Sequence, residues 1–391
     1  MKNLAKRISA LLVFLAAGVM TVSAMGISVF ATPAPEPDDG WRKTDDGWSY
    51  WHYSTRHTPR YYCIENMNFK IDGILYRFDE NGICTGKCSG LMKENGTKRR
   101  YNEGIPYTGW TKNKKDDSRK YYLDGYPVTG EFPIGGKVYS FDEKGVYTGK
   151  SSVPILTTDC GEKISSDTEK FRITVTAHDE KGNSYAVGEP VRMERWEKGQ
   201  WVDCIGEGVE YSRNESMAVM DGSEGDCTLN YDIVEFEPHK YTNSNFNEGY
   251  YRLVFTYWEG SGDGMVLSDK EFYAVFEAVP PVEIRMSQEI YTADEEGNVD
   301  VRAYIDINSE KHKTPESISS ITWEVFALDD RNWYEFIPEA SYEEGCDSVD
   351  SDGTISIDIS SSFKTGSYLM SITFDDSIYN WYYTMFRVDS V

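Results

Sequence analysis

Apolar and polar residues alternate along much of the chain, which is typical of β-strands with one buried face. The longest alternating runs cover residues 171–176, 191–196, 250–257 and 272–277, and turns rich in Gly, Asn and Asp separate them. Shorter runs, such as Tyr139-Ser140-Phe141, recur before residue 150 and end in turns that contain Asp and Gly. The pattern predicts an all-β chain made of many short antiparallel strands.

The segment before residue 150 contains an internal repeat. Residues 71–87 align with residues 134–150 at an offset of 63 residues, and ten of the 17 aligned positions are identical. A shorter match, with an offset of 21 residues, relates residues 101–109 to residues 122–130. One hairpin of about 20 residues cannot bury its aromatic face alone, so successive hairpins are expected to stack. Residues 41–150 are therefore predicted to form a β-hairpin solenoid.

Composition supports strands and divides the chain by charge. Nine leucines follow Ala31, whereas the whole chain has 28 Tyr, 17 Phe and 10 Trp, a balance that favours strands over helices. The net charge of -25 excludes a typical nucleic-acid-binding protein, because such a surface repels phosphates on average. Residues 41–150 have 19 basic and 14 acidic side chains (+5), whereas residues 151–391 have 18 and 48 (-30). Two different surfaces are joined in one chain.

The N-terminus has the pattern of a secretion signal. A short basic stretch precedes an apolar run at residues 8–22, and small residues follow. We expect residues 1–31 to be a signal peptide, cleaved after Ala24 or, as the extended sequence that follows favours, after Ala31. An uncleaved anchor is disfavoured because about 15 apolar residues are too few to cross a bilayer. Residues 32–40 are then a linker, and the mature protein is expected outside the cell with no membrane anchor.

Gly-Trp pairs and aromatic triplets recur in the repeat segment. They stand at Gly40-Trp41, Gly47–Trp51, Gly109-Trp110 and Tyr121–Gly125, and a Thr-Gly pair follows at Thr129-Gly130. This pattern resembles the cell-wall-binding, or choline-binding, repeats of Gram-positive surface proteins. The resemblance implies a cell-wall-associated protein whose aromatic rings bind choline on teichoic acid or stack on wall glycan, with avidity from several weak sites.

The resemblance also assigns a ligand-binding aromatic cage. Its residues are Trp41, Trp48, Trp51, Trp110, Tyr121 and Tyr122. Each ring of such a cage attracts a quaternary ammonium with about 0.5–2 kcal/mol. Lys120 stands where the family has the first ring of a triplet and its charge opposes choline, so the sequence favours a wall or glycan polymer. Other rings of the segment are expected to form its core: Tyr76, Phe78, Tyr139 and Phe141.

Residues 151–280 are expected to form a β-sandwich. They contain Trp196 and Trp201, followed by a Gly-Tyr-Tyr-Arg-Leu strand at residues 249–253, and this order resembles bacterial immunoglobulin-like domains. The strands suit two packed sheets rather than a helical domain.

A similar layout returns after Pro280-Pro281, with Trp323 on one strand and a Gly-Ser-Tyr strand at residues 366–372. Residues 281–391 are therefore predicted to be a divergent second immunoglobulin-like sandwich. The predicted fold class is all-β: a β-hairpin repeat solenoid followed by two immunoglobulin-like β-sandwich domains.

No familiar motif for catalysis or metal binding is present in the sequence. The seven cysteines suit an exported protein, and their spacing leaves local disulfides and free thiols both open. The five histidines form no HExxH pattern, no serine lies in a GxSxG motif, and no Gly-rich phosphate loop occurs. The acidic motif at residues 350–353 departs from the EF-hand calcium pattern. We expect no enzyme activity, no metal and no cofactor.

Three hypotheses about function follow. The first is a secreted, non-catalytic surface protein that the repeats hold to the cell envelope, with acidic immunoglobulin-like domains projecting towards a protein or glycan partner. The second is a secreted adhesin whose repeats bind host or dietary carbohydrate. The third is a peptidoglycan hydrolase with an unrecognised active site, which the motif search disfavours.

Overall fold

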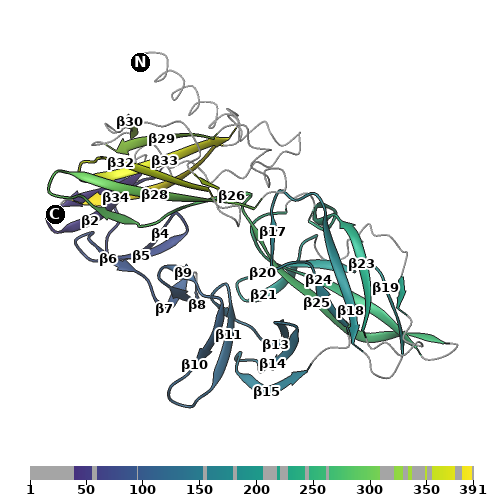
Figure 1. Ribbon diagram of the computed structural model, residues 1–391. Helices are drawn as coiled ribbons and strands as arrows, with labels where there is room; N and C mark the ends of the chain where they lie inside the picture. The colour runs from purple at the N-terminus through teal and green to yellow at the C-terminus, as the bar shows by residue number, and fades with distance from the viewer. Residues whose placement is uncertain are drawn as a thin grey trace.

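The computed structural model describes residues 39–54, 60–94, 96–152, 156–178, 183–205, 218–220, 228–242, 246–260, 264–308, 321–328, 333–336, 348–349, 355–374 and 381–389. These residues form β-strands almost throughout, with one short 3-10 helix, η2 (Pro238–Tyr241). Small hairpin sheets come first and larger, sandwich-like sheets follow (Figure 1). The predicted all-β class is confirmed. The predicted signal peptide, residues 1–31, and most of the linker lie outside the described residues.

The described residues between 40 and 152 form five antiparallel sheets of three strands each. In chain order the strands are β1 (Gly40–Thr44), β2 (Gly47–Ser54), β3 (Arg60–Cys63), β4 (Asn68–Ile71), β5 (Ile74–Phe78), β6 (Cys84–Lys87), β7 (Gly90–Glu94), β8 (Thr97–Asn102), β9 (Ile105–Pro106), β10 (Gly109–Lys112), β11 (Arg119–Leu123), β12 (Tyr126–Pro127), β13 (Gly130–Ile134), β14 (Lys137–Phe141) and β15 (Tyr147–Ser152).

Glycine turns stack each sheet on an earlier one. The amide of Leu75 in β5 donates to the carbonyl of Gly104 at 2.9 Å, and the amide of Arg100 in β8 donates to the carbonyl of Gly125 at 2.8 Å. Both glycines have a positive φ, and a Cβ on Gly125 would lie 2.5 Å from the carbonyl oxygen of Arg100. Glycine is therefore needed here for the turn and for the close approach of two backbones.

The first sandwich is built from two sheets around one core. The strands of the smaller sheet, in spatial order, are β16 (Leu156–Asp159), β18 (Phe171–His178) and β23 (Thr228–Phe236). The larger sheet contains β17 (Lys163–Ser165), β25 (Met265–Val279), β24 (Gly249–Gly260), β19 (Ser184–Val187) and β22 (Ala218–Met220), with β20 (Arg192–Glu197) and β21 (Gln200–Asp203) beside β24. Buried rings and aliphatic side chains of both sheets form a single hydrophobic cluster.

The second sandwich has a closely similar strand order. One sheet contains β26 (Val282–Met286), β28 (Asn298–Ile307), β32 (Ile355–Ser362) and β31 (Ser348–Val349). The other contains β27 (Ile290–Thr292), β34 (Trp381–Asp389), β33 (Gly366–Phe374), β29 (Ile321–Leu328) and β30 (Trp333–Phe336). In each sandwich a short strand, β17 or β27, pairs in parallel with the last strand.

The two sandwiches share a tyrosine contact. The hydroxyl of Tyr251 donates to the carbonyl of Asn247 at 2.8 Å, and that of Tyr368 donates to the carbonyl of Lys364 at 2.8 Å. Both tyrosines follow a glycine at the start of the penultimate strand, and such a contact to an upstream carbonyl is a feature of immunoglobulin-like sandwiches. The contacts agree with the interpretation of the second sandwich as a divergent copy.

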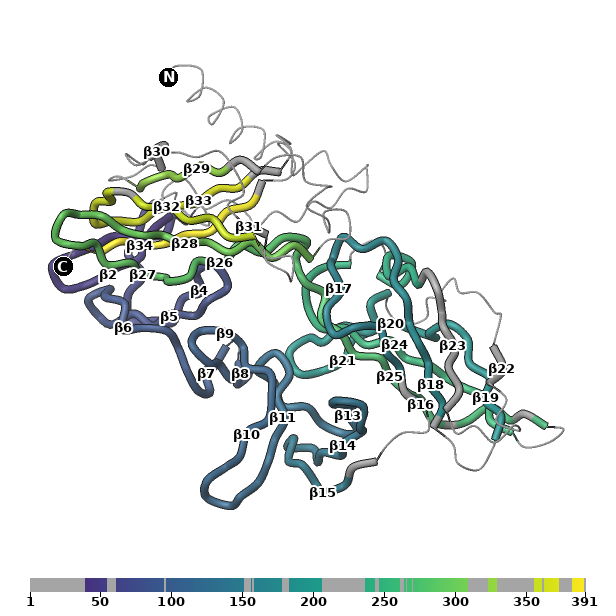
Figure 2. The backbone as a smooth tube through the Cα atoms, viewed as in Figure 1, coloured from purple at the N-terminus to yellow at the C-terminus, as the bar shows by residue number. Residues whose placement is uncertain are grey.

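Both sandwiches pack against the repeats. The indole nitrogen of Trp196 donates to the carbonyl of Leu123 at 3.0 Å, and the hydroxyl of Ser367 donates to the carbonyl of Trp41 at 2.6 Å. The last strands of the chain therefore lie beside the first repeat (Figure 2). The sandwiches lie along the repeats rather than projecting from them, because aromatic faces of the repeats are buried against them.

Candidate ligand-binding site

The six predicted cage residues divide between two sheets. Trp41, Trp48 and Trp51 belong to β1 and β2, whereas Trp110, Tyr121 and Tyr122 belong to β10 and β11. Trp51 and Tyr122 pair with Gly40 and Gly109, so they lie on the opposite faces from Trp41 and Trp110. The structure thus brings together Trp41 with Trp48, and Trp110 with Tyr121, in two separate clusters.

The first aromatic cluster consists of Trp41, Trp48, Tyr50, Tyr76 and Phe78. The ring of Trp41 meets Tyr50 and Tyr76 edge to face, with centroids 5.3 and 5.0 Å apart, and stacks on Phe78 at 5.8 Å. Trp41 and Trp48 are only 5% and 7% exposed. This cluster is closed to solvent.

A cation of the second sandwich fills the first aromatic cluster. The guanidinium carbon of Arg387 lies 4.0 Å from the ring centroid of Trp41 and 5.4 Å from that of Trp48. Burial lowers the pKa of Arg387, and its ion pair with Glu289 opposes that effect. The hydroxyl of Tyr76 donates to Glu289 at 2.5 Å, and burial together with this bond raises the pKa of Tyr76. A desolvated cation–π contact of this kind is worth about 2 kcal/mol.

Two ion pairs flank this buried arginine. Lys43 lies 2.5 Å from Asp389, and Lys87 lies 2.6 Å from Glu289. Their side chains keep between 27% and 35% of their surface exposed, so water and salt screen both pairs. Together with Arg387 they attach the acidic second sandwich to the first two sheets of the repeats.

The second aromatic cluster consists of Trp110, Tyr121, Tyr139, Phe141 and Tyr147. The ring centroid of Trp110 lies 5.4 Å from Tyr121, 5.3 Å from Tyr139, 5.7 Å from Phe141 and 5.6 Å from Tyr147. Phe141 is buried, whereas the other four rings are half-buried. Burial raises the pKa of Tyr121 above its ordinary value. The cluster has a buried base and open ring surface.

Basic side chains extend the second aromatic cluster along the same sheet face. The guanidinium carbon of Arg119 lies 4.8 Å from the ring centroid of Trp110. Arg119 pairs with Lys112, and both share the face of Trp110, two positions along the strands. Lys120 lies on the opposite face and donates from Nζ to the carbonyl of Lys144. The charge of Lys120 is therefore directed away from the ring cluster.

The two clusters occupy equivalent positions of the repeat. Tyr76 and Phe78 correspond to Tyr139 and Phe141 at the offset of 63 residues. The same offset relates Cys84 to Tyr147. Tyr139 was predicted to belong to the core and Tyr147 was not predicted to have a role, yet both are half-buried rings beside Trp110. The alignment of Tyr139 with Tyr76 could be seen in the sequence.

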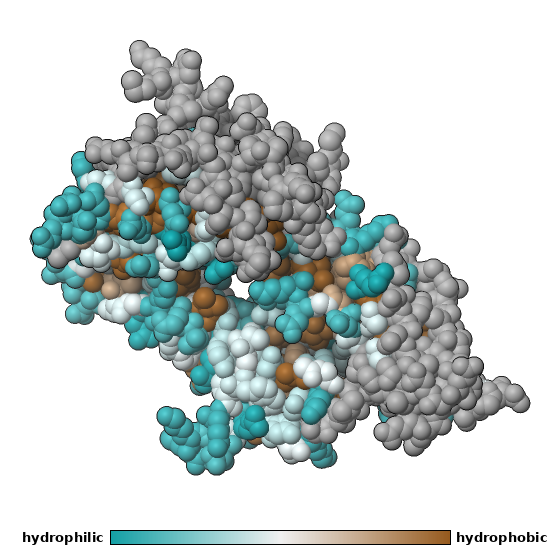
Figure 3. All heavy atoms as spheres, viewed as in Figure 1, coloured by the Kyte–Doolittle hydropathy of each residue, from teal (hydrophilic) through white to brown (hydrophobic). Residues whose placement is uncertain are grey.

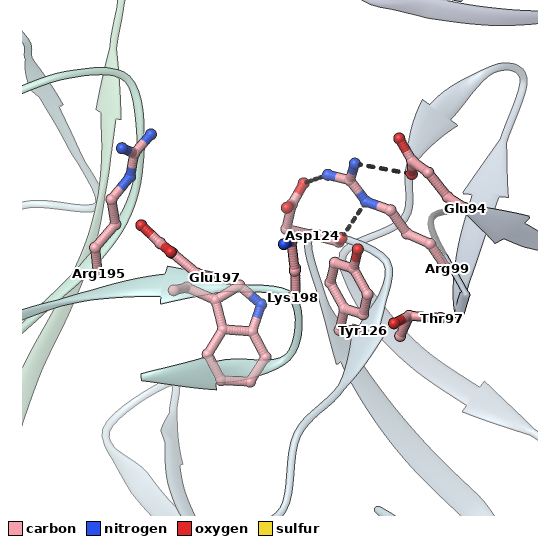
Figure 4. A pocket seen from close by; sticks show the side chains of 9 residues that line it. Glu94, Thr97, Arg99, Asp124, Tyr126, Arg195, Glu197 and Lys198 are labelled. Carbon is pink, nitrogen blue, oxygen red and sulfur yellow. Dashed lines mark hydrogen bonds and ion pairs between the residues drawn. The ribbon is translucent and has the colours of Figure 1, made fainter. Parts of the chain in front are cut away.

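A polar cavity lies between the repeats and the first sandwich (Figure 4). Its volume is about 300 Å³, and it is lined by acidic and basic side chains in equal number: Glu94, Asp124, Glu197, Arg99, Arg195 and Lys198. Arg99 forms ion pairs with Asp124 at 2.5 Å and with Glu94 at 3.4 Å. The two lining aromatics, Tyr126 and Trp196, are 6% and 7% exposed, so little ring surface faces the cavity.

The described residues also include cysteine thiols and possible metal ligands. Five cysteines there, Cys63, Cys84, Cys88, Cys160 and Cys204, are free thiols, and Cys227 and Cys346 lie outside those ranges. In that part of the chain no three His, Cys, Asp or Glu side chains gather as metal ligands. The motif at residues 350–353 lies outside the described residues. No helix in the described part is long and apolar enough to span a membrane.

Comparisons with known proteins give partial likenesses. No family model and no curated protein matches the chain. Choline binding protein F from Streptococcus pneumoniae is 18% identical over 28% of this chain and 34% of that chain, with a TM-score of 0.17. The alternansucrase ASR in complex with isomaltotriose is 15% identical over 36% of this chain and 10% of that chain, with a TM-score of 0.15. A chain of the complex of Dpr2 Ig1-Ig2 with DIP-Theta Ig1-Ig3 is 9% identical over 60% of this chain and 65% of that chain, with a TM-score of 0.20. This chain thus spans less than two thirds of each of these matched chains.

Proposed function

We propose that this is a secreted, non-catalytic protein that stays at the cell wall by binding a wall glycan or glycan-bearing polymer through its second aromatic cluster. The observation that carries the proposal is a group of four half-buried rings, which are Trp110 and its neighbours Tyr121, Tyr139 and Tyr147. Half-buried rings on a rigid sheet suit sugars, because the apolar face of a sugar ring can stack on their open surface with little loss of conformational entropy.

The buried base of the second aromatic cluster supports this role. Phe141 is 5% exposed and stays beneath the ring of Trp110, while the cross-strand pair of Trp110 with Tyr121 fixes the two outer rings. The ring positions are therefore set before a ligand arrives, which lowers the cost of binding. The first aromatic cluster has no comparable open surface, because Arg387 and the second sandwich cover it.

The sequence supports the remaining parts of the proposal. The N-terminal pattern of residues 1–31 is that of a secretion signal, and the chain contains no familiar catalytic motif. In this proposal the two sandwiches hold the repeats in a fixed arrangement, so that the second aromatic cluster is presented to the polymer. Their faces turned away from the repeats remain available to a protein or glycan partner.

Co-sedimentation with purified cell-wall sacculi tests the proposal. Intact mature protein is expected to sediment with the walls, and Trp110→Ala and Tyr139→Ala are expected to lower the bound fraction about tenfold, since each removes one stacking ring. Trp258→Ala is the matched control, because Trp258 is a tryptophan of the first sandwich with 36% of its surface exposed.

Three outcomes would count against the proposal. Equal sedimentation of the Trp110→Ala variant would show that the second aromatic cluster is not the wall-binding site. Failure of the intact protein to sediment, together with Trp110-dependent binding on an array of host and dietary glycans, would favour the adhesin hypothesis. Release of peptidoglycan fragments by the intact protein would contradict the non-catalytic role.

A further inference from the structure

We infer that the ligand of the second aromatic cluster is an anionic polymer, with phosphate or carboxylate groups held by Lys112 and Arg119, and not a quaternary ammonium. This inference rests on the proposed function and names the ligand class of the same site. Four observations carry it. They are the guanidinium groups on Trp41 and Trp110, the contacts of the first aromatic cluster with carboxylates, the positive charge of the hairpin of β10 and β11, and the order of rings and cations along that hairpin.

A guanidinium group already lies on the first tryptophan of each cluster. Arg387 covers Trp41 at 4.0 Å, and Arg119 covers Trp110 at 4.8 Å. Ring faces attract a cation through their negative electrostatic potential, and one guanidinium neutralises part of that attraction. A second cation beside it would also be repelled by the like charge. Neither cluster therefore offers an ammonium-binding face of the kind that the repeat pattern implied.

Within the molecule, polar groups at the first aromatic cluster bind carboxylates. Carboxylates of the second sandwich contact it: Asp389 pairs with Lys43 at 2.5 Å, and Glu289 accepts from Tyr76 at 2.5 Å. Lys112 corresponds to Lys43, because each lies two residues after its Gly-Trp tryptophan and on the same sheet face as that tryptophan. The offset of 63 residues likewise relates Tyr76 to Tyr139.

Two of these anion-binding groups thus recur at the second aromatic cluster. The third group, Lys87, has no counterpart in register, because Ser151 rather than Lys150 lies opposite Tyr139. Arg119 takes the place that Trp48 has in the first cluster, and it adds a basic group there. The sheet face of the second aromatic cluster thus has a cation where the first cluster has a tryptophan ring, and this difference favours binding of anions.

The hairpin of β10 and β11 is the basic part of this face. Residues 112–120 contain five basic and two acidic side chains. The Lys112–Asp117 pair, at 3.0 Å, leaves 62% and 79% of the two side chains exposed, so it contributes at most about 1 kcal/mol and an anionic ligand can displace it. The hairpin tip forms a hydrophilic lobe apart from the body of the molecule (Figure 3).

The order of groups along the hairpin suits a charged glycan. Trp110 and Tyr121 form one cross-strand pair, and Lys112 and Arg119 form another pair on the same face, about 7 Å further along the strands. A sugar stacked on the rings would place its neighbouring phosphate or carboxylate beside the two cations. Residues 151–391, with a net charge of -30, repel the same polymer, which directs it to this hairpin.

Binding of defined polymers to the intact protein tests the inference. The probes are poly(glycerol phosphate), polygalacturonate and neutral dextran of matched length, measured at about 50 and about 200 mM NaCl, with choline chloride as competitor. At least one anionic polymer is expected to bind, about tenfold more tightly than dextran and more weakly at the higher salt concentration. Preference between the two anionic polymers distinguishes phosphate from carboxylate.

A charge-matched pair of double variants tests the residues. Lys112→Gln with Arg119→Gln is expected to weaken anionic-polymer binding about tenfold, because two charge-assisted contacts are lost. Lys98→Gln with Lys270→Gln removes the same charge at exposed positions elsewhere and is expected to change binding by less than about twofold. All four side chains are exposed, so circular dichroism should show an unchanged fold for both variants.

Three results would overturn the inference: equal binding of dextran, release of the polymer by choline, or equal loss in both double variants. If walls still retain the protein through Trp110 while the Lys112 and Arg119 substitutions have no effect, the inference fails and the proposed function stands. If walls retain neither the intact protein nor any variant, the proposed function itself fails.

Discussion

The two aromatic clusters share one repeat framework and differ in what covers them. Trp41 meets Tyr50 at 5.3 Å and Tyr76 at 5.0 Å, and Trp110 meets its two corresponding rings at 5.4 and 5.3 Å. Only the first cluster is closed, by Arg387 and the carboxylates around it. The same ring geometry therefore serves as an internal docking surface in one place and as an open surface in the other.

One cross-strand pair in the last two strands of each sandwich explains why the two sandwiches contact the repeats differently. Ser367 pairs with Arg387 across the last two strands of the second sandwich, and Tyr250 pairs with Glu277 in the first. A carboxylate cannot replace a guanidinium against ring faces, which repel negative charge. The first sandwich instead stacks the ring of Trp201 on Phe132, with centroids 6.3 Å apart. The rings around Trp110 are half-buried.

The largest expected effect on stability comes from the buried arginine. Arg387→Ala opens a void over Trp41 and removes the buried partner of Glu289, which keeps Lys87 and Tyr76, and it should lower the free energy of unfolding by about 3–5 kcal/mol. Urea denaturation would measure this loss. Arg285→Ala, which removes the exposed pair with Asp306, is the control and should cost less than about 1 kcal/mol. Equal losses in the two variants would contradict the closed state of the first cluster.

The glycines through which one sheet stacks on an earlier one, Gly104 and Gly125, should make similar contributions to stability. Gly104→Ala and Gly125→Ala each force a Cβ against the backbone of an earlier sheet, and each should lower the free energy of unfolding by about 2–3 kcal/mol. Gly73→Ala also has a positive φ but meets open space, so it should cost only about 1 kcal/mol. If urea denaturation gave the same loss for all three, stacking between sheets would not be the reason for these glycines.

The tyrosine contacts test the relation between the two sandwiches. Tyr251→Phe and Tyr368→Phe each remove the hydrogen bond donated to a backbone carbonyl, and Tyr251→Phe also removes the longer bond, 3.2 Å, accepted from the amide of Asn247. Each substitution should cost about 1 kcal/mol. Differential scanning calorimetry would compare the two variants. A loss confined to one of them would show that the tyrosine has different roles in the two sandwiches.

The smallest expected effect concerns a partly exposed ion pair. Lys43→Gln removes the contact with Asp389, and because both side chains keep about a third of their surface exposed, the loss should stay below about 1 kcal/mol and shrink with added salt. Thermal unfolding at two salt concentrations would measure it. A salt-independent loss of several kcal/mol would mean that this pair, rather than Arg387, holds the second sandwich in place.

Local patterns in the sequence predicted the strands, the repeat and the sandwich class, because period-two alternation and glycine turns are local signals. The division of the predicted cage could not be seen in the same way. It depends on Arg387, which lies 346 residues after Trp41 in the chain and contacts it only once the second sandwich folds back. The repeat alignment places Tyr139 at the position of Tyr76, so the sequence could predict a ring at this site. The alignment alone does not show which of the two rings stays open to solvent.

Hydroxyl-radical footprinting of the tryptophans, with and without bound wall polymer, tests the central claim most directly. The account predicts that Trp110 is oxidised in the free protein and protected by the polymer, while Trp41 and Trp48, at 5% and 7% exposure, stay unmodified in both states. Oxidation of Trp41 and Trp48 in the free protein and their protection by the polymer, with Trp110 unchanged, would contradict it.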